Sequence, residues 1–138
     1  MIEFKNLKFK YAGAKKLVLD DINLTIEDGD FIGVIGPSGA GKSTLTYAIN
    51  GTVPHHFKGD FYGAVVVNGM DTVENKPDKI ASEVGCVFQD IDAQMTATIV
   101  EDEIRYRLEN FGCPADEIEE RISEALSALH IEKLRTRS

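Results

Sequence analysis

Apolar and polar residues alternate through much of the first quarter of the chain, a pattern typical of strands with one face in solvent. Residues 2–11 alternate loosely, and Ile22, Leu24 and Ile26 alternate strictly with polar neighbours. Short apolar runs at 17–19 and 64–67 predict two more strands, and the Asn-Gly pair that follows the second run is a strong hairpin signal. We therefore expect an antiparallel β region made of residues 1–30 and 59–72.

Two other runs are apolar on both faces. Residues 31–35 and 84–88 lack alternation, which favours buried strands of a parallel sheet. A helix from Gly41 to Asn50 is expected after the first run, with Gly51 ending it, and a loop rich in Pro, His and Gly is expected over 52–63. These segments predict an α/β core formed by residues 31–51 and 80–90.

The last third of the chain has the apolar spacing of helices. Thr98 and Glu101 match a capping box, which predicts a helix from there to about residue 110, with Gly112 ending it. Pro114 suits the first turn of a second helix. One face of that helix would carry Ile118, Ile122, Ala125, Leu126 and Leu129. Residues 91–138 are therefore predicted to begin a helical region.

Composition narrows the classes of partner. The formal net charge of -8 gives a surface that repels nucleic acid and anionic lipid, so no nucleic-acid partner is expected. Because the overall charge repels anions, a phosphate ligand would need a local binding site. The two cysteines fit no metal-binding spacing, which favours a reduced intracellular setting. We see neither a secretory leader nor an apolar run long enough to span a membrane, so contact with a membrane would require a partner.

A candidate for such a local binding site lies between the apolar run 31–35 and the helix that is expected after it. The segment is Gly36-Pro37-Ser38-Gly39-Ala40-Gly41-Lys42-Ser43-Thr44, which matches the phosphate-binding loop pattern in its strand-to-helix context. Glycines let the backbone curl so that its N–H groups face phosphate oxygens, and the helix adds its positive end. Lys42 can reach the terminal phosphates, and the Ser43 hydroxyl can bind Mg²⁺.

Two short segments also match GTPase patterns. Residues 60–63 (Asp-Phe-Tyr-Gly) and 75–78 (Asn-Lys-Pro-Asp) have the required residue types, but both follow the phosphate-binding loop too soon. A guanine-reading Asn should also leave the end of a buried strand, and no such strand precedes Asn75. A P-loop GTPase or kinase therefore stays the less favoured alternative.

Two residues outside the loop indicate a different P-loop family. Tyr11 precedes the loop and offers an aromatic platform for a base, and Gln89 ends the apolar run 84–88. With these residues in this order, the chain resembles the N-terminal half of the ATP-binding domain of ABC transporters. Three details resemble its energy-coupling-factor branch, which imports vitamins and metal ions. They are Asn50-Gly51-x-x-Pro54-His55, Phe88-Gln89-Asp90-x-Asp92-Ala93-Gln94 and Thr98-x-x-Glu101-Asp102-Glu103-Ile104, with Ile91 where that branch usually has proline.

The resemblance implies a role for each matching residue. Tyr11 would stack on adenine, residues 36–44 would wrap the phosphates of ATP, and Ser43 with Gln89 would hold Mg²⁺. Residues 89–110 would begin the helical subdomain that contacts the membrane subunits. The complete protein would be the cytoplasmic ATPase subunit of an importer, pairing with a second ATPase subunit at the inner face of the membrane. On the residues alone, the less favoured alternatives are that Tyr11 simply ends a strand and that Gln89 is an exposed loop amide.

The resemblance also identifies what residues 1–138 do not contain. Hydrolysis in this family needs an apolar strand ending in Asp-Glu, a Leu-Ser-Gly-Gly-Gln segment and a switch histidine, and we find none of them. The resemblance implies that Lys42 and Gln89 contribute to catalysis, but that no catalytic site is complete within these residues. We expect the chain to bind ATP and Mg²⁺ without turnover, with a non-catalytic nucleotide-binding module or relic fragment as the alternative. A parallel core without that strand would leave an exposed edge, so we also expect oligomers or marginal folding.

Overall fold

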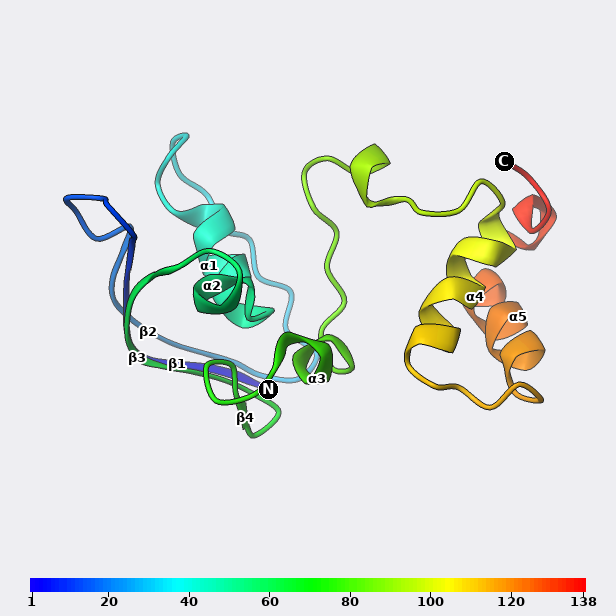
Figure 1. Ribbon diagram of the computed structural model, residues 1–138, viewed down its shortest axis with the longest axis horizontal. Helices are drawn as coiled ribbons and strands as arrows, with labels where there is room; N and C mark the ends of the chain where they lie inside the picture. The colour runs from blue at the N-terminus through cyan, green and yellow to red at the C-terminus, as the bar shows by residue number, and fades with distance from the viewer. The chain divides into compact units, whose positions relative to one another are not determined.

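A four-stranded antiparallel sheet organises the first part of the chain (Figure 1). The computed structural model describes residues 1–138, and these divide into two units, Met1–Cys86 and Val87–Ser138. In the first unit, β1 (Ile2–Tyr11), β2 (Leu19–Ile26), β3 (Gly59–Val67) and β4 (Met70–Asp71) pair in the order β2-β1-β3-β4. The antiparallel β region predicted from the alternation is confirmed, but the run 17–19 is not a separate strand, because β2 begins at Leu19 and continues to Ile26.

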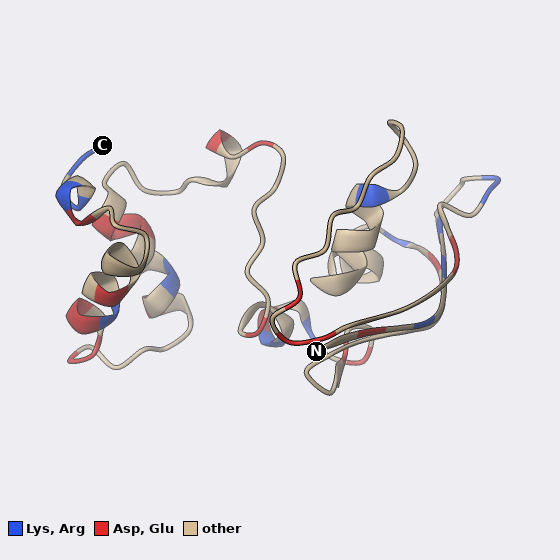
Figure 2. Cartoon of the chain, turned by 180° about the vertical axis from the view of Figure 1, so that it is seen from behind, with Lys and Arg blue, Asp and Glu red and all other residues tan.

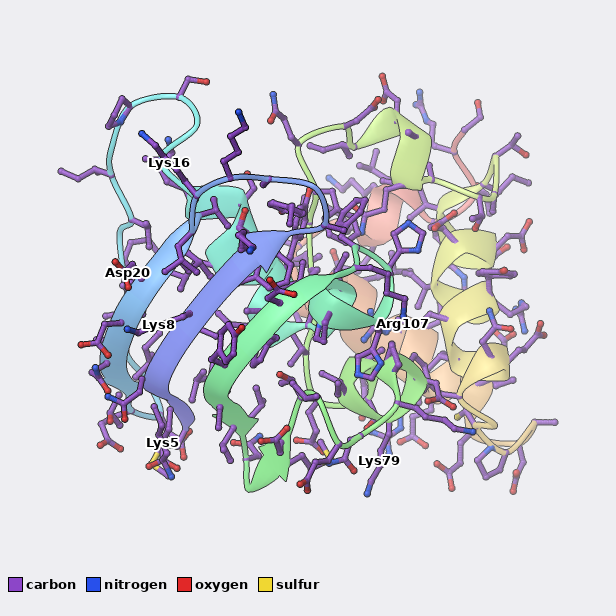
Figure 3. All side chains as sticks on the ribbon, turned by 60° about the vertical axis from the view of Figure 1, so that its left-hand side comes forward. Lys5, Lys8, Lys16, Asp20, Lys79 and Arg107 are labelled. Carbon is purple, nitrogen blue, oxygen red and sulfur yellow. The ribbon has the colours of Figure 1, made fainter.

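The faces of this sheet differ as the alternation requires. Outward-facing lysines of β1 pair with carboxylates on the neighbouring strands: Lys8 Nζ lies 3.6 Å from Asp20 Oδ1 on β2 (both labelled in Figure 3), and Lys10 Nζ lies 2.9 Å from Asp60 Oδ2 on β3. The inner face packs against α1 (Lys42–Ile49) and α2 (Thr52–His55), which lie over the sheet in Figure 1. The buried core there consists of Phe4, Leu7, Phe9, Leu19, Ala48, Val53 and Val65.

The segment 52–63 corrects one prediction. The sequence predicts a loop over 52–63, but Thr52–His55 forms α2, and β3 starts at Gly59, where the predicted β region 59–72 also begins. Val53 is fully buried, so the short helix is stabilised by packing on the core. The His55 imidazole Nε2 lies 2.8 Å from the Thr72 carbonyl oxygen, which ties α2 to the chain just after β4. Such a tertiary contact has no periodic signature in the sequence.

The two strands predicted at 31–35 and 84–88 are a second correction, because neither segment pairs with any strand. Phe31 and Ile35 are 100% and 95% exposed, and Val87 is 80% exposed. A central parallel strand is held by hydrogen bonds to a neighbour on each side, and its apolar faces are covered by helices. Residues 1–138 supply no such neighbours, so the apolar residues stay in solvent. The short helix α3 (Pro77–Ala81), which buries Ile80, precedes the second segment.

The second unit is a pair of packed helices, α4 (Val100–Asn110) and α5 (Ile118–Ala128), with single turns η1 (Asp92–Gln94) and η2 (Glu132–Leu134) on either side of the pair. Ile118, Ile122 and Leu126 of α5 are buried against apolar residues of α4, as the spacing predicted. Leu129, predicted on the same face, is 69% exposed because α5 ends at Ala128 and the chain turns at His130. None of the helices is both long and apolar enough to cross a membrane.

The predicted capping box at Thr98 is not formed. Helix α4 begins at Val100, and no side chain caps it. Its first amides instead donate to the C-terminal segment: Val100 N–H to the Arg137 carbonyl at 3.1 Å, and Glu101 N–H to the Arg135 carbonyl at 3.0 Å. The Arg135 guanidinium also donates to the Glu101 carboxylate at 2.6 Å. The helix start is therefore satisfied by residues distant in sequence.

Candidate nucleotide-binding site

The phosphate-binding loop, residues 36–41, is an exposed turn that leads directly into α1. Ala40 N–H donates to the Pro37 carbonyl at 3.2 Å, and Gly39 has a φ of 80°. Gly41, which immediately precedes the helix, has a φ of 94°. A Cβ at Gly41 would lie only 2.7 Å from the Val18 carbonyl oxygen. Position 41 therefore needs glycine both for its backbone angle and for its close approach to the start of β2.

The first turn of α1 leaves backbone donors open. The first hydrogen bond of the helix runs from Leu45 N–H to the Gly41 carbonyl at 2.9 Å, and no side chain caps the helix. The N–H groups of Lys42, Ser43 and Thr44 consequently have no acceptor within the chain. Open amides and the positive end of the helix dipole together favour an anion at this position.

The first turn of α1 differs in charge from the first turns of α4 and α5. Helix α4 carries Glu101, Asp102 and Glu103 in its first turn, and α5 carries Glu119 and Glu120, so both helix starts already have carboxylates of their own (Figure 2). The first turn of α1 contains no acidic residue. In a chain with a net charge of -8, this helix start remains open to an external anion.

Lys42 places its ammonium group on the loop. Its Nζ donates to the carbonyl oxygens of Gly36 and Pro37, both at 2.8 Å. These two bonds close the loop into a ring through the side chain, and an ammonium group has a third proton to offer. The positive charge therefore lies on the loop that leads into the helix start.

The predicted base platform, Tyr11, is brought to the same helix. Its hydroxyl lies 2.9 Å from Thr44 Oγ1, although the two residues are 33 positions apart. The Tyr11 ring meets Phe9 edge-on, with centroids 4.9 Å apart, and it meets Phe57 at 6.3 Å. Phe57 was not singled out from the sequence; the only signal was an aromatic residue within a segment that was predicted to be a loop.

The two predicted Mg²⁺ ligands lie in different units. Ser43 follows Lys42 on α1 and is exposed, so its hydroxyl is a hard oxygen ligand of the kind that Mg²⁺ takes in proteins. Gln89 belongs to the unit Val87–Ser138 and is also exposed. No group of three or more His, Cys, Asp or Glu side chains is arranged to hold a metal ion. Within the loop and α1, Ser43 is the residue that could hold Mg²⁺, together with the oxygens of a phosphate ligand.

A cavity of about 170 Å³ lies beside the loop and has an apolar lining. Its lining is shared by β2, the segment 31–35 and α1, and consists of Leu19, Ile22, Val34, Ile35, Ala40, Gly41, Lys42 and Leu45. An apolar cavity does not bind phosphate. We interpret it as incomplete packing beneath the loop, next to the unpaired segment 31–35.

The two GTPase-like segments have structural roles. The Asp60 carboxylate pairs with Lys10 across the sheet and raises the pKa of the lysine above its ordinary value, first by a hydrogen bond and then by its charge. The Asn75 amide donates to the Asp71 carbonyl at 2.9 Å and accepts from Lys79 Nζ at 3.0 Å. Asn75 thus closes the turn ahead of α3, and its side chain is not available to read a base.

Comparison with known proteins agrees with this geometry. A family profile described as "ABC transporter" matches residues 19–138. A putative ABC transporter ATP-binding protein of Caldanaerobacter subterraneus is 46% identical over 134 residues, which are 96% of this chain and 24% of that protein.

Two solved structures have the same fold. The structure of cbiO1 from Clostridium perfringens, described as part of the ABC transporter complex cbiONQ, aligns with a TM-score of 0.81 and 28% identity, over 98% of this chain and 52% of the other. A dimeric ATP-binding cassette in a post-hydrolysis state bound to ADP and Pi aligns with a TM-score of 0.75 and 25% identity, over 100% of this chain and 61% of the other. The chain thus spans between a quarter and about three fifths of these proteins.

Proposed function

Because this chain belongs to the ABC transporter family, we propose that residues 36–44 hold the triphosphate of ATP and that the chain is part of the ATP-binding subunit of a transporter. One observation carries the proposal: the amides of Lys42, Ser43 and Thr44 are open at a helix start that has no cap and no acidic residue. The Lys42 ammonium lies at the same loop and adds the charge that a triphosphate requires.

Each remaining residue of the proposed site has a role that its chemistry allows. The Ser43 hydroxyl would hold Mg²⁺, and Gln89 is the proposed second protein ligand of the ion. The Tyr11 ring stacks on the adenine base. Mg²⁺ at this position neutralises charge on the phosphates. The protein groups bind and orient the nucleotide, and Lys42 provides a fixed positive charge beside the terminal phosphates.

We propose that residues 1–138 bind ATP and Mg²⁺ with negligible turnover. Phosphoryl transfer to water needs an oriented water molecule and added charge stabilisation beyond what a phosphate-binding loop provides. The Asp-Glu strand end, the Leu-Ser-Gly-Gly-Gln segment and the switch histidine that supply these in the family are not among residues 1–138. ATP hydrolysis is proposed for the complete domain.

We also propose a role in import and two kinds of partner for the complete protein. The cbiO1 relative is described as part of the complex cbiONQ, and the cassette bound to ADP and Pi is dimeric. By analogy, we propose transmembrane subunits and a second ATPase subunit as partners, with the protein at the cytoplasmic face of the membrane. The motifs around Gln89 favour the energy-coupling-factor branch.

The test is calorimetric titration of the chain with ATP and with GTP in the presence of Mg²⁺. Lys42→Ala removes charge-assisted hydrogen bonds to phosphate, so we expect binding to weaken by about 10- to 100-fold. Lys16→Ala, a change of an exposed lysine in the β1–β2 connection, is the matched control and should bind ATP like the original chain. Unchanged affinity in Lys42→Ala would refute the site, and tight binding of GTP without ATP would refute the role of Tyr11 as an adenine platform.

A further inference from the structure

The hydroxyl pair between Tyr11 and Thr44 connects the sheet to the phosphate-binding helix. Tyr11 is the last residue of β1, and Thr44 lies in the first turn of α1. Thr44 is only 5% exposed, and its Oγ1 lies 2.9 Å from the Tyr11 hydroxyl oxygen. A buried hydroxyl that loses its only partner carries the full cost of desolvation, so this pair holds the two elements together.

The Tyr11 ring is itself held in place by aromatic neighbours. Phe9 meets it edge-on at 4.9 Å, and Phe57 meets it at 6.3 Å with an interplanar angle of 69°. Phe57 in turn packs against Tyr47 of α1, with centroids 5.6 Å apart. The tyrosine hydroxyl is therefore presented to Thr44 by a packed cluster with little freedom to turn.

We propose that Tyr11 is a positioning residue for the phosphate-binding loop: its hydroxyl fixes Thr44 and thereby pre-orders the open amides of residues 42–44 for a polyphosphate. This inference rests on the proposed function, and it adds a role that is independent of any base. The Thr44 amide is one of the three open donors, and its backbone moves with the side chain that Tyr11 holds. Ordering these donors before binding lowers the entropy cost that the anion must otherwise meet.

The role predicts a change in the binding of an anion that has no base. The probe is tripolyphosphate with Mg²⁺, titrated calorimetrically into the 1–138 chain. Tyr11→Phe keeps the ring and removes only the hydroxyl, so binding of tripolyphosphate should weaken by about 2- to 10-fold. If Tyr11 acted solely as an adenine platform, the phenylalanine ring would replace it and neither tripolyphosphate nor ATP would bind differently.

A double-mutant cycle separates positioning from general destabilisation. Thr44→Val removes the partner hydroxyl, and in that background Tyr11→Phe should have no further effect on tripolyphosphate affinity. Thr44→Ser retains the hydroxyl and should restore the sensitivity to Tyr11→Phe. Tyr62→Phe removes the hydroxyl of an exposed tyrosine on β3 and is the matched control, expected to bind like the original chain.

The outcomes distinguish failure of the proposed nucleotide binding from failure of the positioning role of Tyr11. If the original chain binds neither ATP nor tripolyphosphate, the proposed function and this inference both fail. If it binds both and Tyr11→Phe leaves tripolyphosphate affinity unchanged or tightens it, only the positioning role is overturned. Should Tyr11→Phe not fold, the comparison of Thr44→Val with Thr44→Ser decides: equal affinity in these two variants would refute the role of the hydroxyl pair.

Discussion

Two constraints require glycine at position 41: the backbone angle of the phosphate-binding loop and the close packing of the loop against the sheet. The φ of 94° lies where side chains other than glycine are strained. The neighbouring Val18 carbonyl and the Leu19 side chain leave no room for a Cβ, with distances of 2.7 Å and 3.3 Å. The loop is therefore held against the start of β2 through a contact that only glycine permits.

Replacing this glycine should destabilise both the fold and the site. We expect Gly41→Ala to lower the free energy of unfolding by about 2 to 4 kcal/mol, from backbone strain and from overpacking, and to weaken ATP binding. Gly13→Ala is the control, because Gly13 has a φ of 78° with no atom within 4 Å of the added Cβ. It should cost about 1 kcal/mol. Urea unfolding of both variants is the measurement, and equal losses would contradict the close approach to Val18.

At the scale of elements, a carboxylate in the first turn of α4 accepts hydrogen bonds from the segment that precedes the helix. The Glu103 carboxylate accepts hydrogen bonds from Ala97 N–H at 2.6 Å and from Thr96 N–H at 2.8 Å. These bonds, Ala97 first and Thr96 second, hold the pKa of Glu103 below its ordinary value of 4.5. The carboxylate thereby closes the turn that leads into the helix.

The lowered pKa predicts the sign of an acid effect. A carboxyl with a depressed pKa in the folded state stabilises the fold at any pH above its ordinary value, and this contribution is lost as the pH falls through the folded pKa. As the pH falls below the ordinary value of 4.5 and through the lowered pKa of Glu103, the turn at Thr96 and Ala97 should therefore open, measured as a loss of hydrogen-exchange protection of these two amides relative to the unfolded chain. Glu103→Gln should remove this pH dependence, whereas Glu120→Gln, at an exposed position on α5, should preserve it. An acid response retained in Glu103→Gln would contradict the assignment.

At the scale of the whole molecule, apolar residues predicted to be buried remain in solvent. Phe31, Ile35 and Val87 are 100%, 95% and 80% exposed. An unpaired apolar strand offers backbone and side chains to another chain. This exposure supports the expectation from the sequence that the chain associates with itself.

We therefore expect residues 1–138 to self-associate as their concentration rises, which sedimentation velocity measures. Replacing both Phe31 and Ile35 by lysine should reduce this association, because charge blocks edge pairing. Leu129→Lys is the control at another exposed apolar residue, outside the strand-like segments, and should change association less. A chain that stays monomeric at every concentration would contradict the prediction.

The sequence alone determined the local parts of this protein. Alternation predicted the antiparallel sheet, and the glycine pattern at 36–44 predicted the loop ahead of α1, with Gly51 marking the end of that helix. Apolar spacing predicted α5, and α4 was placed by a capping-box match at Thr98 and by Gly112. These features depend on neighbours a few residues apart, which is why a period or a motif reports them. The same pattern identified the family to which the chain belongs.

Only the tertiary structure decided the contacts between distant residues. It paired Tyr11 with Thr44, replaced the expected Thr98 cap by the carbonyls of Arg135 and Arg137, and left residues 31–35 unpaired. A hydrogen bond across tens of residues depends on where the packed elements meet, and a parallel strand forms only where a neighbour is present to accept its hydrogen bonds. Neither condition is recorded in the local order of apolar and polar side chains.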